Sequence, residues 1–531
     1  MRHLLLFICI GFVLSLTSCR EDFEFETSQE NLSFSRDTVY LDTVFSNIGS
    51  STYTLKVYNN SNKDIKIPSI KLAQGETSKY RMMIDGDGMG SGSVAGKIFN
   101  NVELLAKDSM FIFIETTIDY SEYANNETTF LYTDKIEFDS GTNYQTVELV
   151  TLVQDAIFLY PQRNEEGLYE AISISEDDDT LIYGFNLEHD DHNDEYVWTN
   201  TKPYVVYGFA AVPPGETLTV QPGAHVHFHA DSGLIVKNGG TLKIGNETDA
   251  GIEENQVIFE GDRLEPDFAD IPGQWFTIWL QEGSTRHNLN NLIIKNATVG
   301  ILAEGHDGTD ETLKMHNVQI YNNSNVGLLA RNAHITGNNV VINNAGEAGL
   351  ACTLGGYYRF KQCTFANYFN SYNQVPVIAN DYQYVSTDAG NQLYVSNLDL
   401  IFDNCILYGS GNYGILFEKL DDSTTINATL NHCLLKFSDF SQQFRNDPFY
   451  QFEGGGLVTY TGCLIAENST NNNPAFFNPQ NNDLTITKDE SAAQGQADDA
   501  IAAQIPYDIT NVLRTDDPDI GAYESREVPE E

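Results

Sequence analysis

The chain has 531 residues and carries 29 Lys and Arg against 75 Asp and Glu, so its formal net charge at pH 7 is −46. This excess of carboxylates repels nucleic acids, heparin-like chains and anionic lipid surfaces, and we expect no nucleic-acid partner. The length exceeds the size of about 250 to 300 residues at which a single core stops growing. Two or more domains, or a repeat architecture, are therefore expected.

Residues 1–18 have the form of a secretory signal peptide. A basic start precedes an apolar run from Leu4 to Leu16, which is shorter than the roughly 20 residues that a transmembrane helix needs. The ending Leu16-Thr17-Ser18-Cys19 resembles a bacterial lipobox. This resemblance implies that Cys19 becomes the new N-terminus and carries fatty acyl chains such as palmitate, which hold a protein at a membrane without a spanning segment. Ordinary cleavage before a chance cysteine is the alternative.

Residues 19–30 are acidic and polar and are predicted to form a tether. The start of this tether, Arg20-Glu21-Asp22, resembles the signal that sends some Gram-negative lipoproteins to the outer leaflet of the outer membrane. The resemblance implies an outer-membrane lipoprotein exposed at the cell surface. A merely polar tether is the alternative, and it leaves open whether the anchor faces outside or the periplasm.

Residues 31–155 are predicted to form a β-sandwich. Short runs rich in β-branched and aromatic residues, separated by Asn, Gly and Asp clusters, are typical of strands and turns. Examples are Tyr53–Tyr58, Ile65–Ile67, Met110–Ile114 and Thr146–Val153. About seven such strands resemble an immunoglobulin-like domain, which implies a role as a spacer or recognition module. The following residues, 156–204, hold two acidic runs, Glu176–Asp179 and His189–Glu195, and are interpreted as a linker and cap.

The sequence repeats from residue 205 to residue 525. Three units share a strand, an Asn-rich turn, a glycine and a second strand, and they begin at Asn291, Asn317 and Asn339. Their glycines are 27 and 22 residues apart, a spacing typical of solenoids. No 3.6-residue periodicity is present within the units, so helical repeats fit poorly.

Stacking of such units would place equivalent residues about 4.8 Å apart, the spacing of paired strands. We therefore expect a ladder of turn amides and a column of interior aliphatic side chains. The predicted amides are Asn296, Asn322 and Asn343, and the predicted interior residues are Ile294, Ile320 and Ile342. Four cysteines in similar contexts indicate one repeated position filled by a small buried hydrophobic side chain. These are Cys363, Cys405, Cys433 and Cys463.

These units resemble the right-handed parallel β-helix family, which includes pectate lyases, polygalacturonases and phage tailspikes. The resemblance covers residues 205–525, and the ending Asp519–Glu524 is similar to the close of many secreted bacterial β-helix proteins. It implies an all-β protein in which an N-terminal β-sandwich precedes a right-handed, single-stranded parallel β-helix, with an acidic tail at 526–531. We expect residues 156–204 or the sandwich to cover the first coil, because an unpaired sheet end invites aggregation.

Two clusters contain candidate metal ligands. In His225-Val226-His227-Phe228-His229 three imidazoles share one face of a strand, and a His-x-His pair is a known zinc arrangement. Same-face residues lie about 6.6 Å apart, so one ion would bind two of them, such as His225 and His227, and would need a ligand from a neighbouring coil. In the sandwich, Asp85 and Asp87 offer oxygen ligands for calcium. A polar outer face and a hairpin turn are the respective alternatives, and the sequence favours both. No cofactor is therefore expected, and calcium is the alternative.

Aromatic residues supply the candidate glycan contacts. Trp275 and Trp279 are four residues apart, so in an alternating strand they share one face. If the aliphatic face points inward, both indoles are expected outside the helix. Packing under a loop or a neighbouring domain is the favoured alternative for this pair. A predicted insertion between Gly355 and Val395 is rich in aromatics, and long loops on a rigid solenoid often carry its function. Its candidate ligand-binding residues are Tyr357, Tyr358, Arg359, Tyr368 and Tyr372.

The expected function is that of a surface binding or adhesive module for polysaccharide, with the β-helix as a rigid platform. Carbohydrate-active β-helices use paired carboxylates, or a basic residue together with acid-bound calcium. The catalytic motifs of pectate lyases and polygalacturonases are not found in this sequence, so no catalytic residue is assigned and a binding role is favoured over catalysis. A polysaccharide lyase or glycoside hydrolase is the first alternative, and a structural envelope component is the second.

Overall fold

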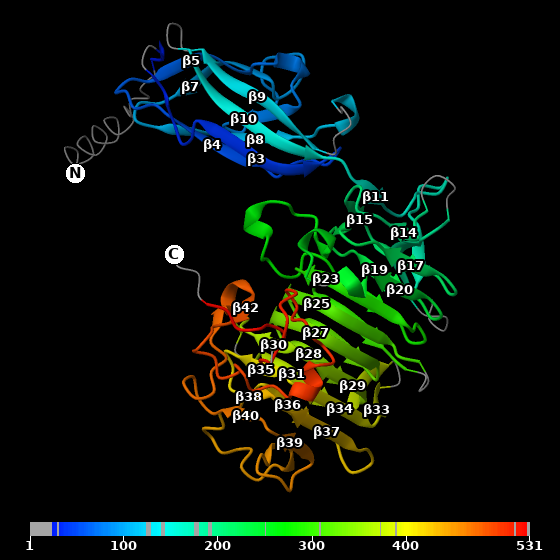
Figure 1. The fold of residues 1–531 in the computed structure, drawn as a ribbon. Helices are drawn as coiled ribbons and strands as arrows, with labels where there is room; N and C mark the ends of the chain where they lie inside the picture. The colour runs from blue at the N-terminus through cyan, green and yellow to red at the C-terminus, as the bar shows by residue number, and fades with distance from the viewer. Residues whose placement is uncertain are drawn as a thin grey trace, which may run out of the picture. The chain divides into compact units, whose positions relative to one another are not determined.

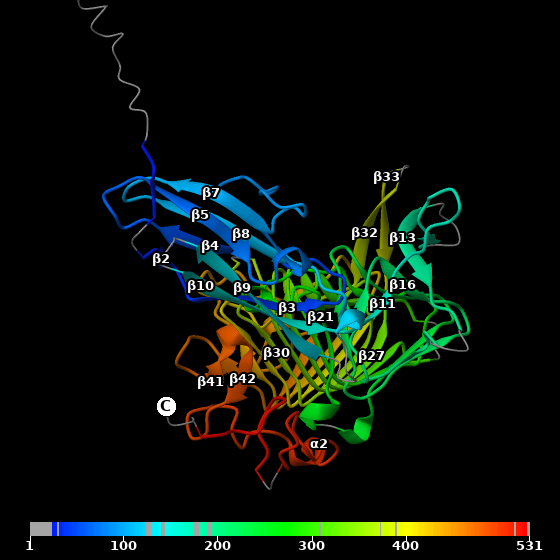
Figure 2. The ribbon, with the colours of Figure 1, turned by 90° about the horizontal axis from the view of Figure 1, so that it is seen from above.

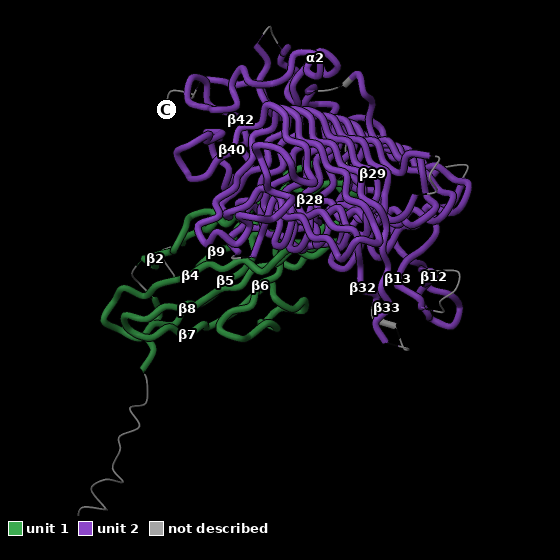
Figure 3. Tube along the Cα trace, turned by 90° about the horizontal axis from the view of Figure 1, so that it is seen from below, with its two compact units in different colours: residues 1–155 green, residues 156–531 purple. Residues whose placement is uncertain are grey.

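The computed structural model describes residues 24–28, 31–123, 129–139, 144–174, 180–189, 194–249, 251–306, 310–371, 373–387, 390–514 and 517–527. The chain divides into two compact units, residues 1–155 and residues 156–531 (Figure 3). In the described residues the one α-helix is α2 (Asp499–Ala502). No helix in these ranges is long and apolar enough to cross a membrane. The predicted signal peptide and Cys19 lie outside the described residues.

Unit 1 is a β-sandwich of two sheets (Figure 1). The larger sheet has the order β1 (Glu26–Thr27), β5 (Ile65–Leu72), β9 (Thr129–Asp139), β10 (Gln145–Gln154) and β3 (Thr38–Phe45), with β7 (Ile98–Leu104) paired to β5. The smaller sheet has the order β2 (Ser33–Phe34), β4 (Tyr53–Tyr58), β8 (Ser109–Thr116) and β6 (Tyr80–Ile84). Two 3₁₀ turns are η1 (Gly75–Thr77) and η2 (Tyr120–Glu122). Apolar residues alternate inward, as at Val147, Leu149 and Val153 of β10, and form one core. The predicted sandwich is confirmed, and its likeness to immunoglobulin domains stays a prediction.

Unit 2 is a parallel β-helix with three faces, whose stacked rungs are visible in Figure 3. Face A consists of β11 (Ile157–Leu159), β15 (Tyr204–Val206), β18 (His225–Phe228), β21 (Val257–Gly261), β30 (Thr364–Asn367), β35 (Ile406–Gly409), β38 (Leu434–Lys436) and β40 (Leu464–Ala466). Face B consists of β14 (Val197–Trp198), β17 (Thr217–Val220), β20 (Thr241–Ile244), β29 (Gly356–Lys361), β34 (Leu398–Asp403), β37 (Ile426–Asn431) and β39 (Val458–Thr461). Three long strands belong to both faces, and they are β23 (His287–Lys295), β25 (Leu313–Asn323) and β27 (His334–Ala345).

Face C is a separate sheet. Its order is β12 (Ala171–Ser173), β13 (Leu181–Asn186), β16 (Phe209–Val212), β19 (Gly233–Val236), β22 (Ile278–Leu280), β24 (Val299–Glu304), β26 (Val326–Arg331), β28 (Ala348–Thr353), β31 (Val375–Asn380) and β36 (Ile415–Glu418). The 3₁₀ turns of unit 2 are η3 (Glu247–Asp249), η4 (Glu253–Asn255), η5 (Pro266–Phe268), η6 (Pro448–Tyr450) and η7 (Pro479–Asn481). The predicted all-β fold with a parallel β-helix is therefore confirmed.

The corner between faces B and A repeats one backbone conformation. Asn291, Asn317 and Asn339 have φ values of 48°, 55° and 50°, in the left-handed region that Asn tolerates better than most residues. Gln362, Asn404, His432 and Gly462 take the same conformation at this corner in later coils. In each coil, the residue that follows this corner residue points into the interior. In chain order these interior residues are Leu292, Val318, Val340, Cys363, Cys405, Cys433 and Cys463. The cysteines thus occupy one repeated coil position, as predicted, and they are free thiols.

Two sequence interpretations need correction. The interior column of Ile294, Ile320 and Ile342 is in register as predicted, but the turn residue that follows Asn296 and Asn322 is Asn344, not Asn343. Asn344 has φ 54°, whereas Asn343 lies within the paired part of β27.

The second correction concerns residues 156–204. These residues are not a separate linker and cap, because β11 and β14 join the sheet of faces A and B and β13 joins face C. The first coils of the β-helix are therefore built from them.

A C-terminal segment, residues 470–526, packs on the outside of face A. It contains β41 (Phe476–Asn478), β42 (Asp483–Ile486) and α2. Leu484, Ile509 and Tyr523 pack against Tyr321 and Val341 of the β-helix, and further contacts follow in later coils. A hairpin of β32 (Tyr382–Thr387) and β33 (Gly390–Val395) stands out from unit 2 on the side opposite α2 (Figure 2).

A buried ion pair lies within this C-terminal segment, and its arginine also contacts the β-helix. The guanidinium of Arg514 donates to Glu524 at 2.6 Å and to the side-chain oxygen of Asn339, at the B–A corner, at 3.0 Å. Burial, followed by the negative charge of Asp519, raises the pKa of Glu524 to about 7 despite the opposing effect of Arg514. The arginine that contacts the β-helix is therefore paired with a carboxyl group that titrates near neutral pH.

The Glu524→Gln variant tests this attachment. Since the pKa of Glu524 is about 7 when folded and 4.5 ordinarily, the folded chain binds the proton more tightly than the unfolded chain between these pH values. The stability from the protonated carboxyl is present at pH 4.5 and is lost as pH rises to 7, by on the order of 3 kcal/mol. Proteolysis of the C-terminal segment should accelerate over this range in the native chain and less steeply in the variant. Identical pH slopes would contradict the assignment.

Candidate functional site

An aromatic and polar cluster lies on the outside of face B, close to the corner where each coil enters from face C. His334 of β27, Tyr357 of β29 and Asp399 of β34 are directly in register in three successive coils. Parallel pairing places such residues about 4.8 Å apart, so they form one column. His306 and Arg359 complete the cluster, and we call these five residues the Tyr357 patch.

Tyr357 lies at the centre of the patch. The side chain is exposed, and its ring centroid is 5.0 Å from that of His306 and 5.9 Å from that of His334. The His306 ring meets the tyrosine ring edge-on, at an interplanar angle of 81°. Two imidazoles therefore hold the phenol ring in place while part of its surface remains exposed to solvent.

Arg359 and Asp399 form the polar half of the patch. Their side chains join at 2.6 Å, and each is about one third exposed. Arg359 also donates to the carbonyl oxygens of Tyr358 at 2.8 Å and Asp399 at 3.2 Å, so its guanidinium is fixed in orientation. One coil earlier, Thr336 donates a short hydrogen bond to Glu311.

The patch offers the two kinds of contact that sugars use. An exposed aromatic ring presents an apolar surface to the apolar face of a sugar ring, and its hydroxyl remains a polar group. A guanidinium–carboxylate pair supplies fixed donors and acceptors for hydroxyl groups. Tyr357 and Arg359 were both predicted as ligand contacts, whereas His306, His334 and Asp399 were not. The signal for His334 and Asp399 is their register with Tyr357, which sequence alone does not give.

Other predicted contacts are placed elsewhere. Tyr358 is fully buried inside the helix, where its hydroxyl donates to the Gly355 carbonyl at 2.9 Å. Tyr368 lies under the C-terminal segment, with its ring 6.3 Å from Phe476. Tyr372 lies outside the described residues. Much of the predicted insertion is regular coil, because β29, β30 and β31 lie within residues 356–380, and the β32–β33 hairpin departs from this coil.

The prediction that both indoles lie outside is wrong for Trp275. This ring is buried and stacks on Phe228 at 4.4 Å. Strand β22 begins only at Ile278, so the two-residue alternation does not extend back to Trp275. Trp279 does point outward from face C, but it is half-buried, and its indole nitrogen donates to Glu304 at 2.6 Å. The two rings therefore do not form a common glycan platform.

The predicted histidine pair has a further potential metal ligand in the neighbouring coil, as the prediction required. His225 and His227 point outward from β18, and Glu260 of β21 lies beside His227 in the next coil. His225 Nε2 is 2.5 Å from Glu260 Oε1, and His227 Nδ1 is 3.8 Å from the same oxygen. Burial lowers the pKa of His227 to about 4. Burial alone would raise the pKa of Glu260, but the His225 hydrogen bond and neighbouring positive charges lower it to about 2.

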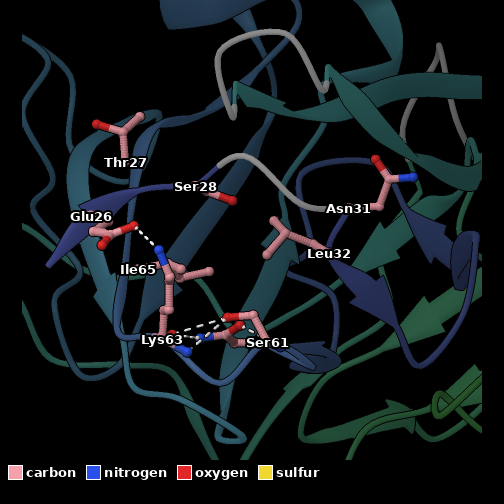
Figure 4. A pocket seen from close by; sticks show the side chains of 9 residues that line it. Glu26, Thr27, Ser28, Asn31, Leu32, Ser61, Lys63 and Ile65 are labelled. Carbon is pink, nitrogen blue, oxygen red and sulfur yellow. Dashed lines mark hydrogen bonds and ion pairs between the residues drawn. The ribbon is translucent and has the colours of Figure 1, made fainter.

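Asp85 and Asp87 form a turn between β6 and β7. Asp85 has φ 47°, and Asp87 Oδ1 accepts from the backbone N–H groups of Met89 at 2.9 Å and Gly90 at 3.1 Å. These contacts are those of the hairpin-turn alternative, with Asp87 used as an acceptor for its own loop. Elsewhere in unit 1, a pocket of about 100 Å³ lies beside the Glu26–Lys63 ion pair (Figure 4). This volume suits a few water molecules rather than a sugar chain.

No protein-family model and no curated protein matches the chain. Among solved structures, the catalytic unit of a thermostable GH87 alpha-1,3-glucanase from Streptomyces thermodiastaticus is 10% identical, covers 78% of this chain and 89% of its own, and has a TM-score of 0.26. The periplasmic alginate epimerase AlgG is 9% identical, with 66% of this chain and 98% of its own covered and a TM-score of 0.24.

The periplasmic chaperone SfaE is 15% identical over 24% of this chain, with a TM-score of 0.15. This chain spans 58% of the length of that chaperone. All three TM-scores lie below 0.5 and carry no argument about fold or activity. The assignment of a β-sandwich followed by a parallel β-helix therefore rests on the strand pairing of this chain.

Proposed function

We propose that this chain is an exported, lipid-anchored bacterial surface protein that binds a neutral polysaccharide at the Tyr357 patch. The observation that carries the proposal is the exposed Tyr357 ring beside the fixed Arg359–Asp399 pair on a rigid sheet. A stacking surface next to oriented hydrogen-bonding groups is the combination that recognises a sugar. The parallel strands beneath the patch hold these groups in place without any loop rearrangement.

The charge of the chain favours a neutral ligand. A net charge of −46 repels a polyanion, and the one guanidinium of the patch is already paired with Asp399. Hydroxyl groups of a neutral sugar can accept from the guanidinium and donate to the carboxylate without breaking this pair.

The β32–β33 hairpin borders the patch along the helix axis. This hairpin follows β31 of face C, in the coil after the one that contains Tyr357. The hairpin base is tied to the patch side by a hydrogen bond from Ser396 to Asn332 at 3.1 Å. Tyr384 and Tyr394 on this hairpin are also exposed.

A glycan-binding measurement tests the proposal. Residues 20–531 should bind at least one neutral polysaccharide on a glycan array, and Tyr357→Ala or Arg359→Met should weaken that binding by about tenfold or more, since one stacking or charged contact contributes roughly 1–2 kcal/mol. Tyr144→Ala removes a tyrosine of the sandwich that is more exposed than Tyr357, and it should leave binding unchanged. Unaltered binding by both patch variants would contradict the proposed site.

A reducing-sugar assay on the same polysaccharides, with and without calcium, separates binding from catalysis. Release of reducing ends would replace the binding role with that of a lyase or glycosidase. Tyr358→Ala is not a useful probe, because removal of this fully buried ring should cost about 3–5 kcal/mol of stability.

The membrane anchor is proposed to be Cys19, on the basis of its Leu16-Thr17-Ser18-Cys19 context. In cells fed an alkyne-labelled palmitate analogue, the native chain should become labelled and partition with membranes. Cys19→Ala should lose the label and appear in the soluble fraction, because the acyl chains supply the hydrophobic contribution to membrane binding. Equal labelling of the variant would show that the anchor is not Cys19, and protease treatment of intact cells would report whether the chain faces outside.

A further inference from the structure

We infer that His225, His227 and Glu260 form a zinc-binding site on face A. Their potential ligand atoms all lie within 4.8 Å of one another. Two imidazoles and one carboxylate are a zinc ligand set that leaves a fourth position for water or a substrate. The inference rests on the geometry of β18 and β21 and does not depend on the polysaccharide proposal.

The register of two coils assembles the site. His225 and His227 alternate with Val226 and therefore share the outer face of β18, and Glu260 lies opposite His227 on β21. The two imidazole rings are 4.2 Å apart. Three ligands thus come from two adjacent strands of a rigid sheet, which is a better support for a metal than a mobile loop.

The two oxygens of Glu260 have different partners. Oε1 faces the imidazoles, at 2.5 Å from His225 Nε2. Oε2 receives the ammonium group of Lys295, one coil further on, at 2.6 Å. A zinc ion bound through Oε1 would take the place of the proton between this oxygen and His225 Nε2, while Lys295 continues to hold the other oxygen. Such contacts to the second atom of a ligand orient it toward the metal.

The backbone also selects a tautomer for His227. Its Nδ1 lies 3.1 Å from the carbonyl oxygen of Gly261, which only accepts hydrogen bonds. Nδ1 therefore carries the proton, and the lone pair resides on Nε2. A hydrogen bond from the other ring nitrogen to a backbone carbonyl is the usual arrangement for a metal-binding histidine.

Burial distinguishes the inner and outer parts of the site. The His227 side chain is 2% exposed and Glu260 is 17% exposed, whereas His225 is 37% exposed. An ion can thus reach the site from the His225 side, and the same opening leaves room for a fourth ligand. The choice of zinc over calcium or magnesium follows from the two imidazoles, because those cations prefer oxygen ligands.

His229 provides a matched control. It is the third imidazole on the same face, but its Nδ1 is engaged by Asp262 at 2.7 Å and its ring stacks on Tyr207 at 4.4 Å. Its removal deletes a nearby histidine without deleting a proposed ligand. Lys295 provides a second probe, since its ammonium group holds Glu260 Oε2 and orients the carboxylate toward the ion.

Zinc titration of the full chain tests the inference. The chain is purified in detergent without a histidine tag, stripped with EDTA and titrated with zinc chloride by calorimetry, with magnesium and calcium chloride as control metals. We expect one zinc per chain, and a loss of about tenfold or more in affinity in His225→Ala and Glu260→Gln. His229→Ala should bind zinc as the native chain does, and Lys295→Gln should bind it more weakly, because Glu260 loses the partner that orients it.

Stability measurements guard against misfolded variants. Zinc should raise the unfolding temperature of the native chain and of His229→Ala, because a ligand that binds only the folded state stabilises it. Zinc should leave the unfolding temperature of His225→Ala unchanged, with circular dichroism confirming its β structure. The inference is overturned if the native chain shows no saturable zinc binding, or if His225→Ala and Glu260→Gln bind zinc as tightly as the native chain.

Discussion

In-register pairing between successive parallel coils is the constraint on which the rest of unit 2 depends. A residue on one strand meets the residue at the same coil position about 4.8 Å away, in the coil before and the coil after. Inside, this rule stacks Ile294, Ile320 and Ile342. Outside, it aligns His334, Tyr357 and Asp399 on face B. In both candidate sites, residues from successive strands therefore lie side by side because the coils that carry them are stacked.

The sequence predicted the interior of the helix better than its corners. Alternating aliphatic residues mark the inward positions of a strand, so the isoleucine column could be read without a structure. At the corner after face A the pattern is ambiguous, because Asn343 and Asn344 are adjacent and either could be the turn residue. The turn is at Asn344, which takes the left-handed conformation. The prediction for Trp275 was wrong for a related reason. This residue lies in a corner before β22, where the two-residue alternation of a strand does not apply.

The sites were predicted in part, since sequence identifies residue types but not the register between distant coils. Tyr357 and Tyr358 are adjacent in sequence, yet one is exposed and the other is in the core. Glu260 is 35 residues from His225, and the coil between their strands has no sequence repeat that would set the alignment. Both strands alternate, however, so a match of the buried Val226 with the buried Phe259 would have placed Glu260 beside His227.

Electrostatics limit what each face can bind. The positive side chains at the key positions of unit 2 are paired, Lys295 with Glu260, Arg359 with Asp399 and Arg514 with Glu524. They neutralise local carboxylates in a chain of net charge −46, and an added anion would have to compete with these partners. A neutral glycan on face B and a cation on face A both avoid that competition. Because the two columns lie on different faces and in different coils, loss of one site would leave the other with all of its contacts.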